Sequence, residues 1–283
     1  SSSSRLYGTW PQFSNLRRII MAAETKKPGR ITDYNKTLPI LELYTCIQSE
    51  GSRQGRPTVA VRTTGCTHRC WFGAGGWCDS WYTSIHPGKG TYTFNDIIKI
   101  YDENPTITEM MLTGGSPTMQ PDLCNELTHF ANERGIFITI ETEGSHFIET
   151  DYPFGLISLS PKFSNSVPKI DVTTPMGKLV DQKMIDKHNS LRLNHQAIEQ
   201  TLAYHSDYHY KPVYDGTEET MNEIEEFRVR HNIPKNKTWL MPAGDNREEL
   251  IKQYPISLEK AFEMGYNWTG RDHIVAWDTK RAV

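Results

Sequence analysis

The chain contains 283 residues, of which 37% are hydrophobic, and it carries a formal net charge of -3. This length and composition suffice for one large domain with a sizeable core. The near-neutral charge excludes the basic surface typical of a nucleic-acid-binding protein, and no apolar run approaches the roughly 18 to 20 residues that a membrane-spanning helix needs. We therefore expect no direct nucleic-acid partner and no association with a membrane.

Cysteine usage points to the compartment. The five cysteines are an odd number, and no secretory signal precedes them. This pattern is typical of a cytoplasmic protein whose thiols stay reduced and free for metal. Three of the five lie close together in one loop. Cys46 and Cys124 lie apart from that loop, and we interpret them as buried structural thiols.

The chain begins with a segment of low hydrophobic periodicity. Residues 1–37 start with SSSS and are predicted to be an N-terminal tail or an expression remnant, ahead of a domain at 38–283. Two β-rich segments open this domain, LPILELYTCIQ and PTVAVRT, joined by the turn-rich stretch SEGSRQGR. We expect the two segments to pair as a hairpin or as neighbours.

Beyond the first strands, predicted helices and strands alternate along the chain. Thr93 can cap the first helix, and Gly135 stands where the second should end. The stretch 178–206 is predicted to be a helical insertion interrupted near Asn189. The other helices are expected at about 94–103, 121–134, 217–231 and 246–264. The principal strands are expected at 57–63, 107–112, 136–141, 156–160, 208–214 and 238–241.

This alternation predicts an α/β fold with a parallel sheet and right-handed crossovers. In such sheets, binding and catalytic residues gather at the carboxyl ends of the strands. Each unusual motif of this chain follows a predicted strand. These motifs are the cysteine loop at 65–80, TGGS at 113–116, ETEG at 141–144, SPK at 160–162 and MPAG at 241–244.

The cysteine loop, GCTHRCWFGAGGWCDS, places Cys66, Cys70 and Cys78 within thirteen residues. Thiolates are soft ligands, so three of them can hold an iron-sulfur cluster or, with a fourth ligand such as His68, a zinc ion. A four-iron cluster held by three cysteines keeps one iron open for a substrate or cofactor. The loop therefore predicts metal-centred chemistry.

The motifs, in their order along the chain, resemble one enzyme family. QSEGSRQGRPTVAVRTTGC, the CDS ending of the cysteine loop, TGGSP, ETEG and SLSPK are similar to the radical S-adenosylmethionine enzyme 7-carboxy-7-deazaguanine synthase. The resemblance covers roughly residues 38–245 and, more weakly, the C-terminal HIVAW. It implies a partial (β/α)6 barrel of the radical S-adenosylmethionine type, most often assembled as a homodimer.

The resemblance also implies a reaction. A reduced 4Fe-4S cluster cleaves S-adenosylmethionine to a 5'-deoxyadenosyl radical, which abstracts hydrogen from 6-carboxy-5,6,7,8-tetrahydropterin. Ring contraction with loss of ammonia then gives 7-carboxy-7-deazaguanine. The family uses Mg2+ and a reducing electron donor such as flavodoxin or ferredoxin. The product serves 7-deazaguanine or queuosine biosynthesis, for tRNA or for DNA, and the sequence does not distinguish these two uses.

Residues of this chain that match the family's motifs are assigned the roles that the resemblance implies. The cluster ligands implied by the resemblance are Cys66, Cys70 and Cys78, and Ser80 stands where the family usually has the threonine that contacts magnesium. The implied substrate contacts are Gln48, Glu50, Arg62, Thr113, Glu141 and His273. The implied cofactor contacts are Gly114, Gly115, Ser116, Ser160 and Lys162. A simpler alternative stays open for three of them: a surface charge for Arg62, a solvated loop residue for Lys162 and a structural role for His273.

Two departures from the family pattern stand out. The family motif is CxxxCxxC, whereas here seven residues separate Cys70 from Cys78; the glycines in this gap are expected to let it loop out while the sulfurs converge. Ser116 replaces the usual glutamate of TGGEP, so the contribution of that carboxylate is absent. Asp79 is interpreted as a loop cap or an indirect contributor, and Glu143 as a turn residue or a further substrate contact.

Three alternatives remain at this stage. The first is a glycyl-radical activating enzyme, which shares the three-cysteine loop but does not explain Gln48, Glu50 and Arg62 ahead of the cluster. The second is a zinc-stabilised interaction module. The third is a copy that has kept the fold while its activity has drifted, which the longer cysteine gap and Ser116 make worth testing.

Overall fold

The computed structural model describes residues 27–73 and 76–283. The sheet follows the chain order of its strands. Its six strands are β1 (Ile40–Ile47), β2 (Pro57–Thr63), β3 (Glu109–Gly114), β4 (Phe137–Thr142), β5 (Leu156–Leu159) and β6 (Tyr208–Tyr210). β1 is antiparallel to β2, and every other neighbouring pair is parallel. The predicted pairing of the first two β-rich segments is therefore confirmed.

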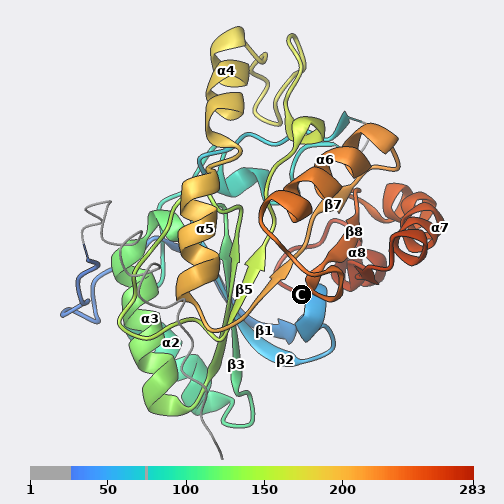
Figure 1. Ribbon diagram of the computed structural model, residues 1–283. Helices are drawn as coiled ribbons and strands as arrows, with labels where there is room; N and C mark the ends of the chain where they lie inside the picture. The colour runs from blue at the N-terminus through green and yellow to red at the C-terminus, as the bar shows by residue number, and fades with distance from the viewer. Residues whose placement is uncertain (1–26, 74–75) are drawn as a thin grey trace, which may run out of the picture.

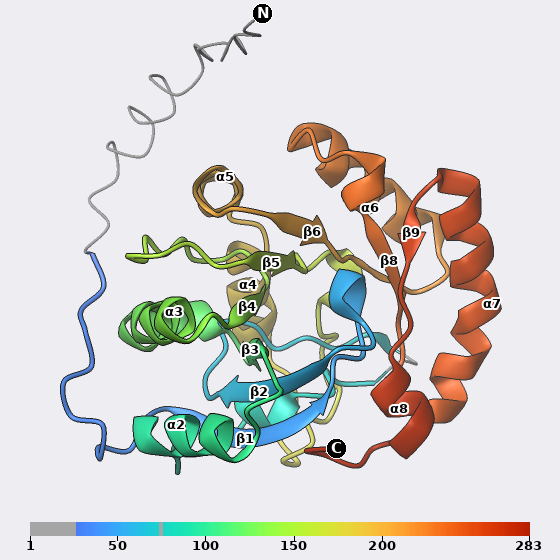
Figure 2. The same ribbon diagram turned by 90° about the horizontal axis from the view of Figure 1, so that it is seen from below.

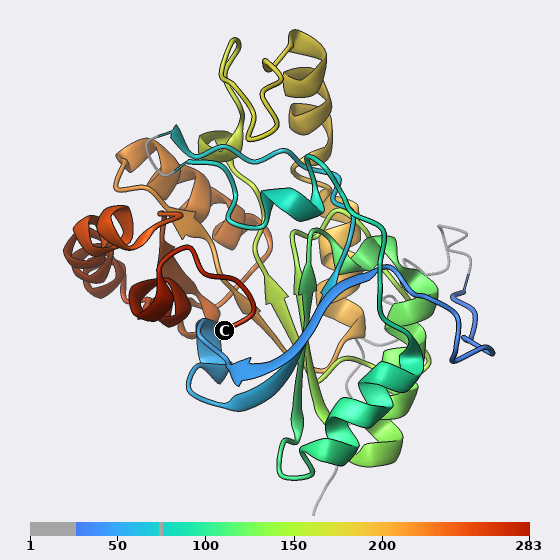
Figure 3. The same cartoon turned by 180° about the vertical axis from the view of Figure 1, so that it is seen from behind.

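A second, three-stranded sheet continues the arrangement. It contains β7 (Val213–Tyr214), β8 (Trp239–Pro242) and β9 (Asn267–Trp268), all parallel. A parallel bridge between Tyr210 and Thr238 links the two sheets. Seen along the strands, the two sheets follow one arc with the helices on its outer side, and β1 forms one edge (Figures 2 and 3). This is the predicted α/β class, in the form of a partial barrel.

The helices fill the crossovers between strands. They are α2 (Phe94–Glu103), α3 (Pro121–Arg134), α4 (Gln182–Leu191), α5 (His195–Tyr204), α6 (Glu218–Arg230), α7 (Arg247–Met264) and α8 (Asp272–Trp277). Short 3-10 turns lie at Gly51–Arg53, Trp81–Thr83, Pro117–Met119, Ser164–Ser166 and Lys235–Lys237. Local chemistry explains the helix ends: Thr93 forms a capping box with Asp96, and Gly135 ends α3 in the left-handed conformation at φ 66°.

The predicted strand at 208–214 is wrong, because the segment forms two strands in two different sheets. Lys211 and Pro212 separate β6 from β7. Pro212 has no N–H to donate to a neighbouring strand, while its carbonyl accepts a hydrogen bond from the Met241 amide at 3.1 Å. The chain therefore pairs with β5 as β6 and then, after Pro212, pairs with β8 in the second sheet as β7.

The helices predicted at 178–206 are confirmed, but the break between them lies at residues 192–194 and not near Asn189; that this stretch is an insertion stays a prediction. Asn194 caps the second helix, α5, by accepting a hydrogen bond from the Ala197 amide. Figure 1 shows α4, in yellow, standing off the body of the molecule above α5. β9 and α8 were not predicted, because both are too short to show periodicity.

Residues 27–37, predicted as part of a tail, pack on α3. Arg30 forms an ion pair with Glu126 at 2.6 Å, and the Tyr34 hydroxyl donates to the same carboxylate. Thr37 forms an antiparallel bridge with Thr93. This part of the segment therefore belongs to the folded body, while residues 1–26 lie outside the described residues.

The core lies between the parallel strands and the helices. The strand residues Val59, Val61, Leu112, Ile140 and Leu159 are each at most 1% exposed. Strands buried on both faces are typical of parallel sheets, and this burial fixes their carboxyl ends against one another. No helix of the described residues is long and apolar enough to cross a membrane.

Candidate active site

A cavity of about 350 Å³ opens at the carboxyl ends of the strands. Its lining includes every predicted site residue except Ser116. The lining residues named from the sequence are Gln48, Glu50, Arg62, Cys66, Cys70, Cys78, Ser80, Thr113, Gly114, Gly115, Glu141, Ser160, Lys162 and His273. Segments far apart in the sequence thus meet at one place because their strands end at the same edge.

The lengthened cysteine gap folds back on itself. Trp71 and Trp77 form an antiparallel bridge, and the Cys78 amide donates to the Cys70 carbonyl at 3.0 Å. In this register Cys70 and Cys78 stand opposite each other at the base of a small hairpin. Gly73 and Gly76 adopt the positive φ values that its turn needs, 64° and 75°, whereas residues 74–75 lie outside the described residues. The extra residues loop out without separating these two cysteines.

The three thiols share the cavity in the protonated state. Burial raises the pKa of Cys66 to about 12 and that of Cys78 to about 11, and it raises the pKa of Cys70 well above its usual range. Metal ligation requires thiolates, so the ion itself must displace these protons. Within residues 27–73 and 76–283, no three His, Cys, Asp or Glu side chains stand close enough to hold one metal ion.

The two glycines of TGGS pack against the start of the cysteine loop. A Cβ atom at Gly114 would come within 2.4 Å of the Thr63 carbonyl oxygen, and one at Gly115 within 2.2 Å of the Gly65 carbonyl oxygen. Gly114 also adopts a φ of 141°, which L side chains rarely adopt. Packing within the protein therefore requires glycine at these two positions, apart from any contact with a cofactor. The two glycines let the backbone just before Cys66 pack closely against the turn after β3.

Ser116 is buried beneath the cavity instead of lining it. Its hydroxyl donates to the Glu143 carboxylate at 2.7 Å. Glu143 comes from the end of β4, is 5% exposed and lines the cavity. A carboxylate thus stands beside Ser116 although residue 116 itself lacks one. The Thr67 hydroxyl also donates to Glu143, at 3.3 Å, which ties this carboxylate to the cysteine loop.

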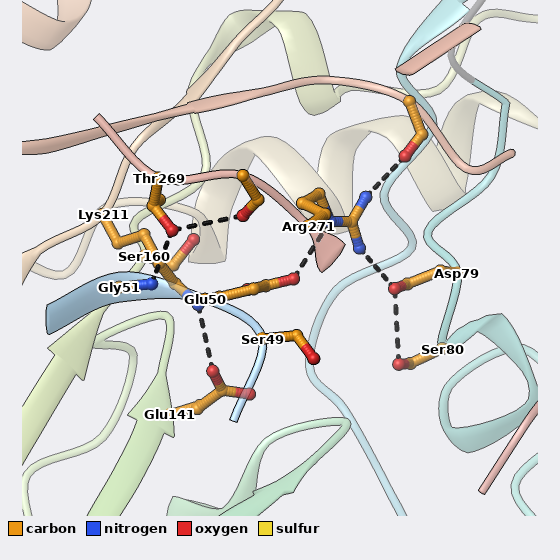
Figure 4. A network of polar contacts seen from close by, with 12 residues as sticks. Ser49, Glu50, Gly51, Asp79, Ser80, Glu141, Ser160, Lys211, Thr269 and Arg271 are labelled. Atoms are coloured by element: carbon orange, nitrogen blue, oxygen red, sulfur yellow. Dashed lines mark hydrogen bonds and ion pairs between the residues drawn. The ribbon is translucent and has the colours of Figure 1, made fainter. Parts of the chain in front are cut away.

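A chain of alternating charges crosses the floor of the cavity (Figure 4). Lys211 donates to both Glu50 and Glu141, the latter at 3.0 Å. Arg271 donates to the other oxygen of Glu50 at 3.0 Å and also to Asp79. Lys211 is 3% exposed, so the centre of this network is buried, whereas Glu141 and Asp79 at its two ends are partly exposed in the cavity. Three carboxylates and two cations are held together here in a fixed geometry.

The cations keep these carboxylates ionised. Burial alone would raise the pKa of Glu50, but Lys211 and Arg271 outweigh it and hold that pKa well below its usual range. Arg271 likewise overcomes burial and lowers the pKa of Asp79 to about 2. Burial works against the charge of Lys211 too, yet Glu141 and Glu50 raise its pKa. Glu50, Asp79 and Lys211 are therefore charged at neutral pH.

The remaining predicted substrate contacts surround this floor. The Gln48 side chain is buried, and its Oε1 atom has no hydrogen-bond partner among the described residues. Arg62 donates from Nε to Glu42 at 2.7 Å and from Nη1 to the Ser80 hydroxyl at 3.0 Å. The Thr113 hydroxyl donates to Glu141 at 2.7 Å. A buried acceptor without a donor is costly unless a ligand supplies one.

Comparison with known proteins identifies the family. The chain is 34% identical over 248 residues to a 7-carboxy-7-deazaguanine synthase from Halobacterium salinarum, which covers 85% of this chain and 91% of the relative. The chain belongs to the 7-carboxy-7-deazaguanine synthase family. A 7-carboxy-7-deazaguanine synthase from Rhodopirellula baltica is 28% identical over 262 residues, covering 93% of this chain and 94% of the relative. The resemblance found in the motifs is thereby confirmed.

The fold agrees with this assignment. A crystal structure of QueE from Escherichia coli matches with a TM-score of 0.56 and 17% identity, over 83% of this chain and 93% of that one. At this identity the likeness shows the fold alone. No family model matches the chain.

Sequence reasoning missed two residues of the site in this member of the 7-carboxy-7-deazaguanine synthase family, Lys211 and Arg271. Lys211 directly follows β6, so the rule that functional residues sit at strand ends could have found it had the strand boundary been drawn correctly. Arg271 lies two residues before His273, just ahead of the HIVAW motif quoted for the resemblance. No local pattern indicated that its guanidinium reaches Glu50 and Asp79.

The two cysteines outside the loop differ from each other. Cys124 is 0% exposed and donates to the Pro117 carbonyl, as expected of a buried structural thiol. Cys46 is only half-buried and lines the cavity, so its interpretation as a fully buried thiol is wrong. β1 is the edge strand, with one neighbour, and that leaves its cavity-side residues partly open.

Two buried histidines of this synthase-family chain predict acid sensitivity. Burial lowers the pKa of His205 to about 4 and that of His209 to about 3. Below a pH of about 6.5 these imidazoles become protonated in the unfolded chain but stay neutral in the folded protein. As the pH falls, each histidine therefore lowers the free energy of unfolding by up to about 1.4 kcal/mol per pH unit. Urea unfolding at about pH 7, 6 and 5 measures this slope. His209→Gln should flatten it, and an unchanged slope would contradict the assignment.

Proposed function

We propose that this chain is a radical S-adenosylmethionine lyase that converts 6-carboxy-5,6,7,8-tetrahydropterin to 7-carboxy-7-deazaguanine with loss of ammonia. The observation that carries the proposal is one cavity that combines three cysteine side chains with a charged, acceptor-rich floor. Membership of the 7-carboxy-7-deazaguanine synthase family supports it and leaves the glycyl-radical activating enzyme and the zinc module without support.

The cysteine loop suits a cluster that leaves one metal open. Cys66, Cys70 and Cys78 line the same cavity, and the hairpin brings two of them opposite each other. We propose that they hold a 4Fe-4S cluster. When bound there, the cluster and S-adenosylmethionine supply the radical that starts the reaction. The protein itself contributes ligands, orientation and the exclusion of water.

The methionyl part of S-adenosylmethionine is proposed to lie along the turn after β3. Gly114 and Gly115 offer backbone without side chains there, and both line the cavity. Lys162, whose ammonium donates to the Ser160 hydroxyl at 3.0 Å, is proposed to meet the carboxylate of the cofactor. Glu143, beside Ser116, is proposed to meet its ammonium group and so to replace the carboxylate that TGGSP lacks.

The pterin is proposed to bind over the charged floor. Its amide and amino edge presents N–H donors, and the oxygens of Glu50 and Glu141 and the unpaired Gln48 Oε1 can accept hydrogen bonds from them. The Arg62 guanidinium, which also lines the cavity, is proposed to bind the substrate carboxylate. Thr113 and His273 complete the proposed contacts.

Ser80 is proposed to contribute to a magnesium site. Its hydroxyl is a hard oxygen donor 3.4 Å from the Asp79 carboxylate, and both residues line the cavity. Magnesium usually keeps several waters and takes few protein ligands. A homodimer, a flavodoxin-like or ferredoxin-like electron donor and a cytoplasmic location remain predictions from the resemblance and the cysteine usage.

An anaerobic turnover assay tests the proposed function. Reconstituted protein, a reductant, S-adenosylmethionine, Mg2+ and the carboxytetrahydropterin should yield 7-carboxy-7-deazaguanine, detected by mass spectrometry. Formation of 5'-deoxyadenosine while the pterin stays intact would show that the substrate assignment is wrong. Formation of neither product by a protein that has bound iron would favour a copy whose activity has drifted.

A further inference from the structure

The hairpin that carries Cys70 and Cys78 is too small to be stable alone. A single bridge between Trp71 and Trp77 joins its two arms. An isolated two-stranded hairpin is marginally stable in water at best. The direction in which the two thiols point therefore depends on what packs against residues 66–78.

The supporting contacts come from the chain after β5 and from α4. The Arg69 amide, directly before Cys70, donates to His188 Nδ1 at 3.2 Å. The Trp71 amide, directly after Cys70, donates to the Ser166 carbonyl at 2.9 Å. Both backbone N–H groups that flank Cys70 are thus bound by one part of the chain, which includes the first helix of the insertion.

His188 and Ser166 are themselves joined. A backbone N–H can only donate, so His188 Nδ1 accepts from Arg69 and its Nε2 carries the proton. His188 Nε2 lies 3.0 Å from the Ser166 hydroxyl, which in turn donates to the Phe163 carbonyl at 2.7 Å. His188 is 1% exposed and Ser166 is 0% exposed. The neutral imidazole therefore completes a buried chain of hydrogen bonds in which every group has a partner.

Further contacts extend the same support. The Trp77 indole donates to the Thr173 carbonyl at 3.1 Å. The rings of His68 and His188 meet edge to face, with centroids 5.2 Å apart. Both arms of the hairpin and the turn between Cys66 and Cys70 therefore contact the segment 163–188.

We propose that His188 is a positioning residue for the cysteine loop, and that the first helix of the insertion exists to brace the lengthened gap between Cys70 and Cys78. The inference rests on the proposed function, since it takes these cysteines as cluster ligands. It also links the longer cysteine gap to α4, because a longer gap needs an outside support and α4 supplies one. His188 acts through the backbone and touches neither substrate nor cofactor.

Thiol labelling of the reduced, metal-free protein tests this directly. The rate at which a maleimide modifies each cysteine is measured by peptide mapping in the wild type and in His188→Leu. Losing a buried hydrogen bond that closes a local structure should speed labelling of Cys70 by about tenfold or more. His188→Asn keeps an acceptor for the Arg69 amide and should restore most of the protection.

His205→Leu is the matched control. His205 lies just after α5, in the other half of the insertion, and its Nδ1 also accepts from a buried backbone amide, that of Phe154 at 3.3 Å. This variant should lower the melting temperature without speeding the labelling of Cys70. Equal acceleration in both variants, or none in His188→Leu, would overturn the inference. If His188→Leu does not fold, Ser166→Ala is used in its place. An unchanged rate of Cys70 labelling in that variant would also overturn the inference.

Iron release separates this inference from the proposed function. In anaerobically reconstituted protein, a chelator should remove iron faster from His188→Leu than from His205→Leu. If the wild type binds no iron at all, the proposed function fails, while the labelling rates of the metal-free protein still decide whether His188 holds the loop.

Discussion

Cys70→Ala is expected to abolish turnover, lowering the rate of product formation by at least about a thousandfold. Cys70 is 6% exposed and stands opposite Cys78 at the base of the hairpin, so neither solvent nor a neighbouring side chain can replace its sulfur. A cluster held by the two remaining thiolates should be lost on gel filtration. Iron content per chain, the brown absorbance of the reconstituted protein and 5'-deoxyadenosine formation should fall together.

Cys124→Ala is the matched control for this experiment. Cys124 is as deeply buried as Cys70 but lies in α3, where its thiol donates to the Pro117 carbonyl at 3.3 Å. Its replacement should lower the free energy of unfolding by about 1 to 2 kcal/mol and leave iron content and turnover unchanged. Full iron content and turnover in Cys70→Ala would contradict the cluster assignment.

Lys211→Met is expected to lower the rate of product formation by about a hundredfold while 5'-deoxyadenosine formation without the pterin persists. The ammonium of Lys211 pairs with both Glu50 and Glu141, and the methionine leaves both half-buried carboxylates without that cation. Lys211 makes no hydrogen bond with the cysteine loop among those of the described residues, so cluster binding should be unaffected. The loss should appear mainly as weaker pterin binding.

The same substitution should destabilise the protein by about 3 to 5 kcal/mol near neutral pH, because it breaks a buried ion pair from one side. In the wild type the pKa of Glu50 is lowered, so its contribution is present above the unfolded pKa of about 4.3 and is lost as the pH falls. Without Lys211, only one of the two cations that offset burial remains, so the pKa of Glu50 rises and acid relieves part of the penalty. In urea unfolding, the difference in the free energy of unfolding between variant and wild type should therefore narrow as the pH falls toward about 4.5.

A charge-balanced double variant separates stability from binding. Lys211→Met with Glu141→Gln removes one cation and one carboxylate together, so much of the lost stability should return. Pterin binding should not return, because an amide cannot replace the ionised acceptor of Glu141. Recovery of both stability and pterin binding would mean that Lys211 contributes to folding only.

The alternation of strands and helices could be predicted because burial on both faces of a parallel sheet leaves continuous apolar runs in the sequence. β2 was predicted to the residue, and β3, β4, β5 and β8 were displaced by one or two residues at one or both ends. The single long strand at 208–214 failed for a local reason, since Pro212 cannot continue the hydrogen-bonding pattern. Short elements such as β9 form only because a neighbouring strand already exists to pair with them.

The sequence by itself determined the motifs, their order and the rule that strand ends would gather them, because residue type and hydrophobic periodicity are local properties. It therefore identified the family and a set of site residues that, except for Ser116, all line the cavity. Only the tertiary structure decided which charges meet: Lys211 and Arg271 join Glu50, Glu141 and Asp79 across 70 to 221 residues of chain. It also decided that His188 holds the backbone beside Cys70. Such contacts depend on how separate elements pack, and no spacing within one segment encodes them.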